Sequence, residues 1–432
     1  MSIEKYLFVQ VAAWGYEFSR KHGVEQIGGC PVQPIKPVFP AVTCTAQATF
    51  RTATLPAVHG MVGNGIWFDQ LQKPLFWEQS SRLVEGRRIW DGYRTAGGKV
   101  GLAFIQQSLG EDADLVISPA PIHKHGGGMI MGCYSKPAGV VERMTAVVGR
   151  RFRLMDYWGP LSGPRGSEWI ADAICALLDS PDAPDLLYTY LPALDYDLQR
   201  VGPDHPKSAT ALRVVQAEIG KLLRVATGKG YEVVCFGDYA IESVTHPPVL
   251  PNRALRKAGL FRTRDVAGRA YPDFYQSQAF VVCDHQVGTV YCPDPALVPQ
   301  VATFLRELPG VEEVMDTTRQ RETGVAHPNA GALVVVAEPG SWLAYPWWDS
   351  PKEAPDFATH IDIHNKPGFD PCELFFGGWN PFQVSLDTGK VRGSHGRADG
   401  DARAAAFLST TSFDHTSLLE LAESVAEKLK RQ

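Results

Sequence analysis

The sequence predicts an α/β fold built on a mostly parallel sheet with helices on both faces. Short apolar runs alternate along the chain with longer segments in which apolar residues recur every three to four positions. Near-continuous apolar strands are typical of parallel sheets that are buried on both faces, and the alternation places the helices on those faces. The composition, 44% hydrophobic and 21% charged residues over 432 positions, is that of a soluble globular protein with a large core.

The order of the core elements follows from the same patterns. The first strand is predicted at Tyr6–Val11, and a proline-rich loop over Gly28–Pro40 leads to Thr43, where a helix of small residues begins. A second helix is expected over Ser80–Ala96, ended by two glycines. The remaining core elements are strands at 100–104, 115–118, 186–191 and 231–236, a helix capped by Ser167, a long helix over Leu212–Ala226 and a terminal helix over Leu418–Leu429.

Residues 247–355 differ in character from the rest. They hold short predicted strands at 279–283, 311–315 and 332–338, a helix around Leu297–Leu308 and a stretch rich in Trp and Pro at Trp342–Pro351. We interpret this segment as a smaller α+β subdomain that caps the site. The chain is therefore predicted to form a core from residues 1–246 and 356–432, with 247–355 inserted between its two parts.

The net charge and the positions of the cysteines limit the classes of partner and the cellular compartment that the sequence predicts. The net charge of −5 and pI near 6.2 favour neither a nucleic-acid nor a membrane-surface partner. No run approaches the roughly 20 apolar residues of a membrane span, and the apolar run Tyr6–Trp14 is interpreted as a strand and not as a signal peptide. The cysteines are scattered without a CxxC pair, which predicts a reduced, cytoplasmic protein.

The stretch Val38–Asp69 holds the first candidate site. Thr43 follows an apolar turn and begins a helix, and a hydroxyl at a helix N-terminus faces backbone N–H groups and the positive end of the helix dipole. Such a position suits a phosphate group. A simpler reading is that Thr43 acts only as a helix N-cap.

This stretch resembles the type I phosphodiesterase/nucleotide pyrophosphatase family of the alkaline phosphatase superfamily. The matching residues are Phe39-Pro40, Thr43, Pro56, His59-Gly60 and Asn64, with further matches at Tyr190–Pro203 and Gly237–Ile241. The resemblance implies an alkaline-phosphatase-like sandwich with an inserted cap, a Thr nucleophile at Thr43, and two divalent metals that clamp a phosphoryl group.

The resemblance implies metal ligands on two loops that follow strands. Asp195 stands where the family has an Asp, but Gln199 replaces the His expected four residues later, and Asp197 is an extra carboxylate that could compensate. Asp238 matches the Asp of an Asp-His-Gly motif in which Tyr239 replaces the His. Tyr is a rare zinc ligand, although it can hydrogen-bond a phosphoryl oxygen.

Two further positions of the implied metal site are also changed. A His-Gly-Tyr-Asp type segment is matched to Gly368-Phe369-Asp370, where Pro367 replaces the His, so His364 is the expected substitute and His360 the second choice. The family's Asp after the first strand is Ala12 or Ala13 here. The expected cofactor is a divalent metal, zinc first and manganese second, and its ligands are predicted to be Asp195, Asp197, Gln199, Asp238 and His364.

The substrate-binding residues implied by the resemblance lie near Thr43. The family's Pro-Asn-His after the nucleophile is Thr45-Ala46-Gln47, so Thr45 or Gln47 is expected to supply a donor to the phosphoryl group, together with Asn64 and Tyr239. The expected partner is a small phosphoester or phosphonate. Lower-ranked candidates are the loop residues His123 and His125.

Two functions are weighed. The first is a metal-assisted phosphodiesterase or pyrophosphatase with Thr43 as nucleophile. The second is a metal-poor, catalytically degenerate member that binds a ligand or partner in a biosynthetic pathway, which the changes at Ala13, Gln199, Tyr239 and Pro367 favour. An altered chemistry on phosphonates or phosphorylated cyclitols is a third possibility.

Overall fold

The core is an eight-stranded sheet in the order β11-β8-β7-β12-β1-β13-β24-β4. A computed structural model of the chain describes residues 3–126, 128–361, 364, 366–378 and 380–431. The five strands from β8 to β13 run parallel, and β11, β24 and β4 are joined by antiparallel pairings. Their bounds are β1 Lys5–Val11, β4 Gln33–Ile35, β7 Val100–Ala103, β8 Leu115–Pro119, β11 Cys133–Lys136, β12 Leu186–Leu191, β13 Tyr231–Gly237 and β24 Ala405–Ser409.

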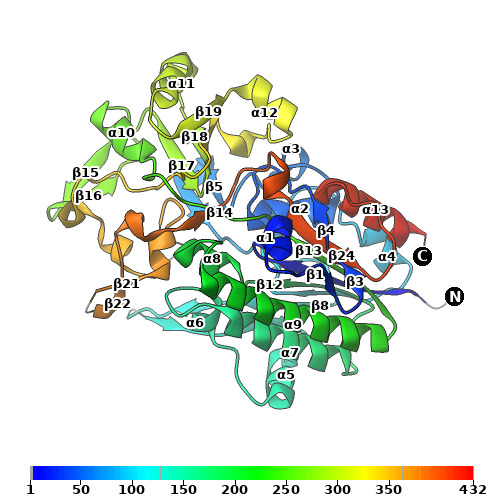
Figure 1. Ribbon diagram of the computed structural model, residues 1–432. Helices are drawn as coiled ribbons and strands as arrows, with labels where there is room; N and C mark the ends of the chain where they lie inside the picture. The colour runs from blue at the N-terminus through cyan, green and yellow to red at the C-terminus, as the bar shows by residue number, and fades with distance from the viewer. Residues whose placement is uncertain (1–2, 127, 362–363, 365, 379, 432) are drawn as a thin grey trace.

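Helices cover both faces of this sheet, as the sequence predicts (Figure 1). One face carries α5 (Val140–Val148), α7 (Pro164–Leu178) and α9 (Pro206–Gly228). The other carries α2 (Thr43–Thr52), α4 (Asp91–Thr95) and α13 (Leu418–Lys430). The central strands β1, β12 and β13 are buried along almost their whole length, because apolar side chains meet a helix layer on either side.

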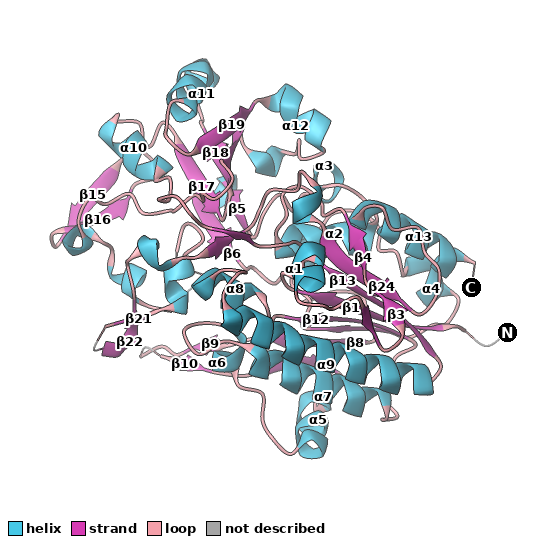
Figure 2. Cartoon of the chain, in the orientation of Figure 1, coloured by secondary structure: helices cyan, strands magenta, loops and turns pink. Residues whose placement is uncertain are grey.

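A smaller sheet with its own core lies beside the main one (Figure 2). Its order is β17-β18-β20-β19, and it packs with α10, α11 and α12. The bounds are β17 Phe280–Asp284, β18 Val287–Tyr291, β19 Val311–Met315, β20 Leu333–Ala337, α10 Pro251–Lys257, α11 Val298–Arg306 and α12 Thr317–Thr323. The hairpin β5 (Gly65–Phe68) and β6 (Lys73–Phe76) reaches out of the main domain and places Phe76 in this second core.

Short elements complete the chain. They are α1 Tyr16–Lys21, α3 Pro56–His59, α6 Leu154–Tyr157, α8 Asp195–Val201, β2 Gln26–Ile27, β3 Cys30–Pro31, β9 Ile122–His123, β10 Met129–Ile130, β14 Glu242–Ser243, β15 Thr263–Val266, β16 Arg269–Pro272, β21 Phe376–Gly377, β22 Asn380–Val384 and β23 Gly393–Ser394. Within the ranges described above, no helix is both long enough and apolar enough to cross a lipid bilayer.

The structure corrects two helix predictions. The segment Ser80–Ala96 is not one helix but a short 3₁₀ turn at Ser81–Leu83 and then α4, because Gly86 takes a left-handed φ of 89° that interrupts a helix. Ser167 does not cap α7, which begins at Pro164. Its hydroxyl instead accepts a hydrogen bond from the Ala193 backbone N–H at 2.9 Å, in the loop that leads to the site.

A buried histidine joins the end of α2 to the turn that follows α3. The Nδ1 of His59 accepts from the Met61 backbone N–H at 3.1 Å, so its Nε2–H donates to the Thr49 hydroxyl at 3.0 Å. Burial, with the nearby Arg51 charge, lowers the pKa of His59 to about 3. The neutral imidazole therefore fixes the loop that carries Asn64 against the helix that carries Thr43.

The pH dependence of folding tests this contact. A histidine in the unfolded chain takes up a proton below about pH 6.5, whereas folded His59 resists protonation until about pH 3. The contribution of His59 to the free energy of unfolding is therefore complete above pH 6.5. It decreases as the pH falls, and the loss is about 2 kcal/mol at pH 5. Denaturant unfolding from pH 7 to 5 should show a shallower loss for His59→Gln than for wild type. His125→Gln, at an exposed site, should follow wild type.

Candidate active site

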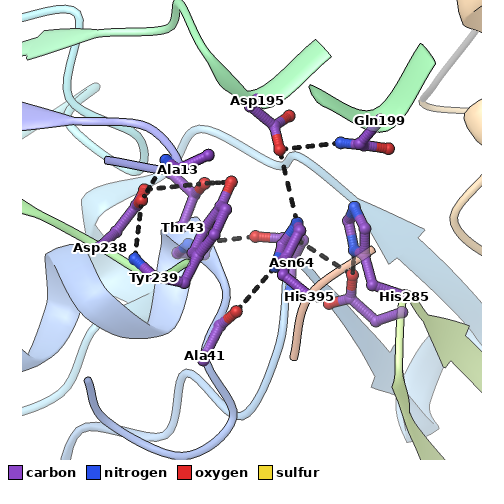
Figure 3. Close-up of polar contacts among 12 residues, drawn as sticks. Ala13, Ala41, Thr43, Asn64, Asp195, Gln199, Asp238, Tyr239, His285 and His395 are labelled. Atoms are coloured by element: carbon purple, nitrogen blue, oxygen red, sulfur yellow. Dashed lines mark hydrogen bonds and ion pairs between the residues drawn. The ribbon is translucent and has the colours of Figure 1, made fainter. Parts of the chain in front are cut away.

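The site forms where the carboxyl ends of three neighbouring parallel strands meet. Strand β1 pairs with β12 and with β13 so that Val11 lies opposite both Leu191 and Gly237. The loops that leave these ends carry Ala13, Asp195 and Asp238, and Figure 3 shows them around one centre. Ligands of open parallel sheets bind at this edge, so the position of the site follows from the topology.

The carboxylate of Asp238 is the most completely bonded group in the site. Its Oδ1 accepts from the backbone N–H groups of Ala13 at 2.9 Å and Tyr239 at 3.0 Å. Its Oδ2 lies 3.2 Å from Gln10 Nε2 and 3.3 Å from the Thr43 hydroxyl. The Tyr188 hydroxyl donates to Gln10 Oε1, which leaves the Gln10 amide N–H to face Asp238. Burial raises the pKa of Asp238 to about 8, against the opposing effect of these donors.

Thr43 stands at the first position of α2 with its hydroxyl directed at this carboxylate. The hydroxyl also lies 3.2 Å from the Tyr239 hydroxyl and 3.4 Å from that of Tyr190. The N-cap of α2 is Val42, so Thr43 does not serve as the N-cap. Its hydroxyl is free to face the site, at the positive end of the helix dipole.

Asp195 faces Thr43 from the second loop. Its Oδ1 accepts from Gln199 Nε2 at 2.8 Å, and the Nε2 of His395 lies 3.6 Å from the same oxygen, too far for a hydrogen bond. His395 is anchored by Nδ1, which contacts the Ala41 carbonyl oxygen at 2.7 Å, and its ring stacks on Tyr239 at 3.6 Å. Two buried atoms here, His395 Nε2 and Gln199 Oε1, have no hydrogen-bond partner among the residues that the structure describes. Burial raises the pKa of Asp195 to about 7.

The smaller domain contributes Asp284 and His285 from the turn between β17 and β18. Asp284 accepts from the Asn64 backbone N–H at 2.6 Å and from Asn64 Nδ2 at 3.1 Å, and Asn64 Oδ1 accepts from the Cys44 N–H at 3.0 Å. His285 Nδ1 lies 2.8 Å from Asp284 Oδ1. Asn64 therefore links the first turn of α2 to the tip of the small sheet.

Several of these residues border one cavity of about 220 Å³, while Asp238, Asp284 and His395 lie behind its wall. Thr43, Asn64, Asp195, Tyr239 and His285 form its polar end. Aromatic and proline side chains form most of the rest, namely Trp77, Pro119, Pro121, Tyr157, Trp158, Tyr190, Pro192, Tyr196 and Phe369. The arrangement offers the Thr43 hydroxyl and the Asp195 carboxyl group to a small ligand that has an apolar portion.

The structure brings most of the predicted site residues together but gives several of them other partners. The Thr45 hydroxyl donates to the Met61 carbonyl oxygen at 3.0 Å, and Gln47 Oε1 accepts from the Gln106 N–H at 2.7 Å, so each of these side chains has a partner other than Thr43. Asp197 pairs with Arg200 at 3.2 Å. His364 lines the cavity, with Nδ1 3.2 Å from the Phe76 carbonyl oxygen. Their roles as ligands or binding residues stay predictions.

Three site residues escaped the sequence reasoning. His395 carried a signal, because His395-Gly396 is a His-Gly pair of the kind sought at residues 364–370, yet lies beyond that segment. Asp284 and His285 follow an ordinary apolar strand and gave no signal. Only the packing of the small domain on Asn64 brings them to the cavity.

Comparison with known proteins agrees with this geometry. The profile of the type I phosphodiesterase/nucleotide pyrophosphatase family matches residues 28–370. The chain belongs to this family. No curated protein sequence matches the chain significantly.

Several solved structures share the fold. Murine ectonucleotide pyrophosphatase/phosphodiesterase 5 matches with a TM-score of 0.61 and 15% identity, over 99% of this chain and 95% of its own. Phosphonoacetate hydrolase from Sinorhizobium meliloti 1021, in complex with phosphonoformate, matches with a TM-score of 0.64 and 14% identity over the same shares. An inactive form of the murine protein is in complex with AMP. At these identities the likeness shows the alkaline-phosphatase-like fold.

The donor set differs from that of a two-metal site. Across the described part of the chain, no group of three or more His, Cys, Asp or Glu residues is placed to hold a metal ion. At the metal position expected next to Thr43, Ala13 has no carboxylate and instead donates its backbone N–H to Asp238. Tyr239 stands in place of the expected His, and its ring stacks on His395. At the other position, His395 Nε2 lies 3.6 Å from Asp195 Oδ1 and has no hydrogen-bond partner among the described residues, and Gln199 presents its Nε2 to Asp195. Asp195 and His395 fit a single cation there, and Gln199 would offer its oxygen to it once its amide turns over.

The close approach of two loops sets the position of Asp238. A Cβ atom on Gly237 would lie 2.2 Å from the Trp14 carbonyl oxygen, which is backbone and cannot move aside cheaply. We expect Gly237→Ala to destabilise the fold by roughly 2–3 kcal/mol and to displace Asp238. Thermal unfolding measures the effect. Gly228→Ala, where a Cβ meets nothing within 4 Å, should be neutral or slightly stabilising, and equal stability of the two variants would contradict the steric argument.

Proposed function

We propose that the protein is a metal-assisted hydrolase of small phosphoesters, of the phosphodiesterase/nucleotide pyrophosphatase type, with Thr43 as nucleophile. The observation that carries the proposal is the 3.3 Å separation of the Thr43 hydroxyl from the Asp238 carboxylate, at the head of α2 and on the border of a cavity. Family membership and the neighbours that bind AMP or phosphonoformate support a phosphoryl or phosphonyl ligand.

The chemistry follows from the contacts. Asp238 Oδ2 takes the proton of the Thr43 hydroxyl as its Oγ bonds to phosphorus, and the bond from phosphorus to the substrate's alkoxy oxygen breaks, so that this oxygen leaves as an alkoxide or phenolate that takes a proton from solvent. The four donors around Asp238 hold the carboxylate in place, with its Oδ2 3.3 Å from the Thr43 hydroxyl whose proton it accepts. The N-terminal end of α2 and the Tyr239 hydroxyl stabilise the negative oxygens of the phosphoryl group. Water then cleaves the Thr43 phosphoester.

Asp195, Gln199 and His395 are the residues that would hold a divalent cation. A cation bound there polarises a phosphoryl oxygen and offsets its charge. A carboxylate, an amide oxygen and an imidazole are a mixed donor set, which suits zinc or manganese. Asp238 already receives four hydrogen bonds, so within this proposal it serves proton transfer.

The second candidate function is a catalytically degenerate, ligand-binding protein. It is favoured by the Ala13 N–H bond to Asp238 and by the Tyr239 ring stacked on His395, which replace two metal ligands of the family pattern. The aromatic cavity would serve either function. Activity and metal content separate the two.

Removal of the Thr43 hydroxyl tests the first candidate. Wild type, supplied with zinc or manganese, should hydrolyse bis(para-nitrophenyl) phosphate, and Thr43→Ala should lose at least about 1,000-fold in kcat/KM because the covalent route is gone. Thr52→Ala, on the same helix with its hydroxyl bonded to the Ala48 carbonyl oxygen at 2.7 Å, is the matched control and should keep its activity. Turnover by Thr43→Ala at the wild-type rate would rule out this nucleophile.

Metal content tests the cation site. After incubation with zinc and dialysis, elemental analysis should find about one metal per chain, because one set of donors keeps a carboxylate and an imidazole while the other has Ala13 and Tyr239 in place of its Asp and His. Asp195→Asn and His395→Gln should each reduce this content severalfold, while Asp197→Asn, which removes a charge paired with Arg200, should not. Two metals per chain would contradict the single-site assignment, and none would favour the ligand-binding protein.

A further inference from the structure

A second tyrosine hydroxyl lies beside the nucleophile. Tyr190 is the fifth residue of β12, so it stands near the carboxyl end of a central parallel strand, where the site forms. It is buried, borders the cavity, and places its hydroxyl 3.4 Å from Thr43 Oγ. Among the residues that the structure describes, Thr43 is the only hydrogen-bonding partner of this hydroxyl.

The neighbouring tyrosine on the same strand shows the contrast. Tyr188 lies two residues earlier, and therefore on the same face of the sheet as Tyr190. Its hydroxyl donates to Gln10 Oε1, inside the core, as a buried phenol ordinarily does. The hydroxyl of Tyr190 instead meets only the proposed nucleophile.

The direction of the contact follows from the proton of Thr43. A threonine hydroxyl has one proton to donate and two lone pairs. When Asp238 is ionised, the proton is directed at Asp238 Oδ2, 3.3 Å away, so the Tyr190 O–H is the donor to Thr43 Oγ. A separation of 3.4 Å is long for two hydroxyl oxygens. The Tyr190 O–H is therefore free to turn to a negative oxygen that a ligand brings.

The geometry of displacement decides which oxygen that is. In an in-line displacement at phosphorus, the leaving oxygen lies opposite the attacking one, and the equatorial oxygens lie beside the forming bond. A donor within reach of Thr43 Oγ lies beside that bond, so it meets an equatorial oxygen and not the leaving group. Tyr239, 3.2 Å from Thr43 Oγ, approaches from the loop after β13. Within the described ranges no hydrogen bond joins the two phenols, so each can serve a different oxygen.

The charge of the cavity makes such donors necessary. Its lining, over the described part of the chain, contains no lysine or arginine, and none of the residues outside the described ranges is a lysine or arginine. The negative charge that gathers on a phosphoryl group must therefore be met in part by neutral donors. Fixed neutral donors in a buried site stabilise such charge effectively, because they need no reorganisation.

We propose that Tyr190 is a catalytic residue that donates its phenol O–H to an equatorial oxygen of the phosphoryl group as Thr43 attacks. The inference rests on the proposed function and assigns part of its charge stabilisation. The hydrogen bond strengthens as charge gathers on that oxygen, and the phenol keeps its proton throughout. Tyr239 donates to another equatorial oxygen.

Removal of the hydroxyl alone is the first test. With bis(para-nitrophenyl) phosphate and added zinc or manganese, Tyr190→Phe should lower kcat by about 100-fold, because one donor to the transition state is lost. KM should change by less than about threefold, since the ring is kept. Tyr231→Phe is the matched control. It removes a buried hydroxyl that donates to the Pro184 carbonyl oxygen, at the opposite end of β13, and should keep the wild-type kcat.

A chiral substrate separates donation from a structural role. The two isomers of methyl para-nitrophenyl phosphorothioate place either oxygen or sulfur at Tyr190, and sulfur is a weak acceptor. Tyr190→Phe should slow the isomer with oxygen there about 100-fold and the other by about tenfold or less, so the ratio of their rates shifts by about tenfold. Tyr239→Phe should shift the ratio in the opposite direction, and Tyr231→Phe should leave it unchanged.

The outcomes distinguish this inference from the proposed function. If wild type with added metal hydrolyses none of these diesters, the proposed function fails and this inference with it. If wild type turns over while Tyr190→Phe keeps its kcat, or slows both isomers equally, the role of Tyr190 is overturned and Thr43 stands as nucleophile. An equal loss of kcat in Tyr231→Phe would also overturn it, because loss of any buried phenol hydroxyl would then suffice.

Discussion

The hydrogen bonding of one buried carboxylate ties the site together. Asp238 receives N–H groups from the end of β1, from its own loop and from Gln10, and faces the hydroxyl that begins α2. An ionised carboxylate without these donors would be costly to bury, because desolvation penalises its charge. The loops after β1 and β13 and the first turn of α2 therefore take their positions from this group. The same bonds occupy the oxygens that a second metal would need.

In our proposal, the site keeps the loop arrangement expected for its family, and protein groups take over part of the work that metal ions would do. Ala13 contributes a backbone N–H where the family pattern has a carboxylate, and Tyr239 contributes a phenol where it has an imidazole. A site with fewer anionic ligands binds fewer metal cations. In our proposal, proton transfer to Asp238 and a hydrogen bond from the Tyr239 hydroxyl therefore contribute more to catalysis. The small sheet brings His285 to the border of the cavity and is tied to the site by the hydrogen bonds between Asp284 and Asn64.

Much of this arrangement could be predicted from the sequence, since parallel strands end at a common edge. Asp195 and Asp238 each follow an apolar strand, and Thr43 begins a helix after a proline turn, so their convergence follows from topology. Local patterns were less reliable where backbone conformation intervened: the helix expected over Ser80–Ala96 is interrupted at Gly86. The positions of His285 and His395 depend on contacts between segments far apart in the chain, which no local pattern reports.

A structure of the wild-type protein bound to orthovanadate would test the central claim most directly. Vanadate forms five-coordinate adducts that mimic the phosphoryl-transfer transition state. Our account predicts vanadium bonded to the Thr43 Oγ, with Asp238 Oδ2 within hydrogen-bond distance of that oxygen and Tyr239 on an equatorial oxygen. Vanadate bound in the cavity away from Thr43, or bonded to another side chain, would contradict it.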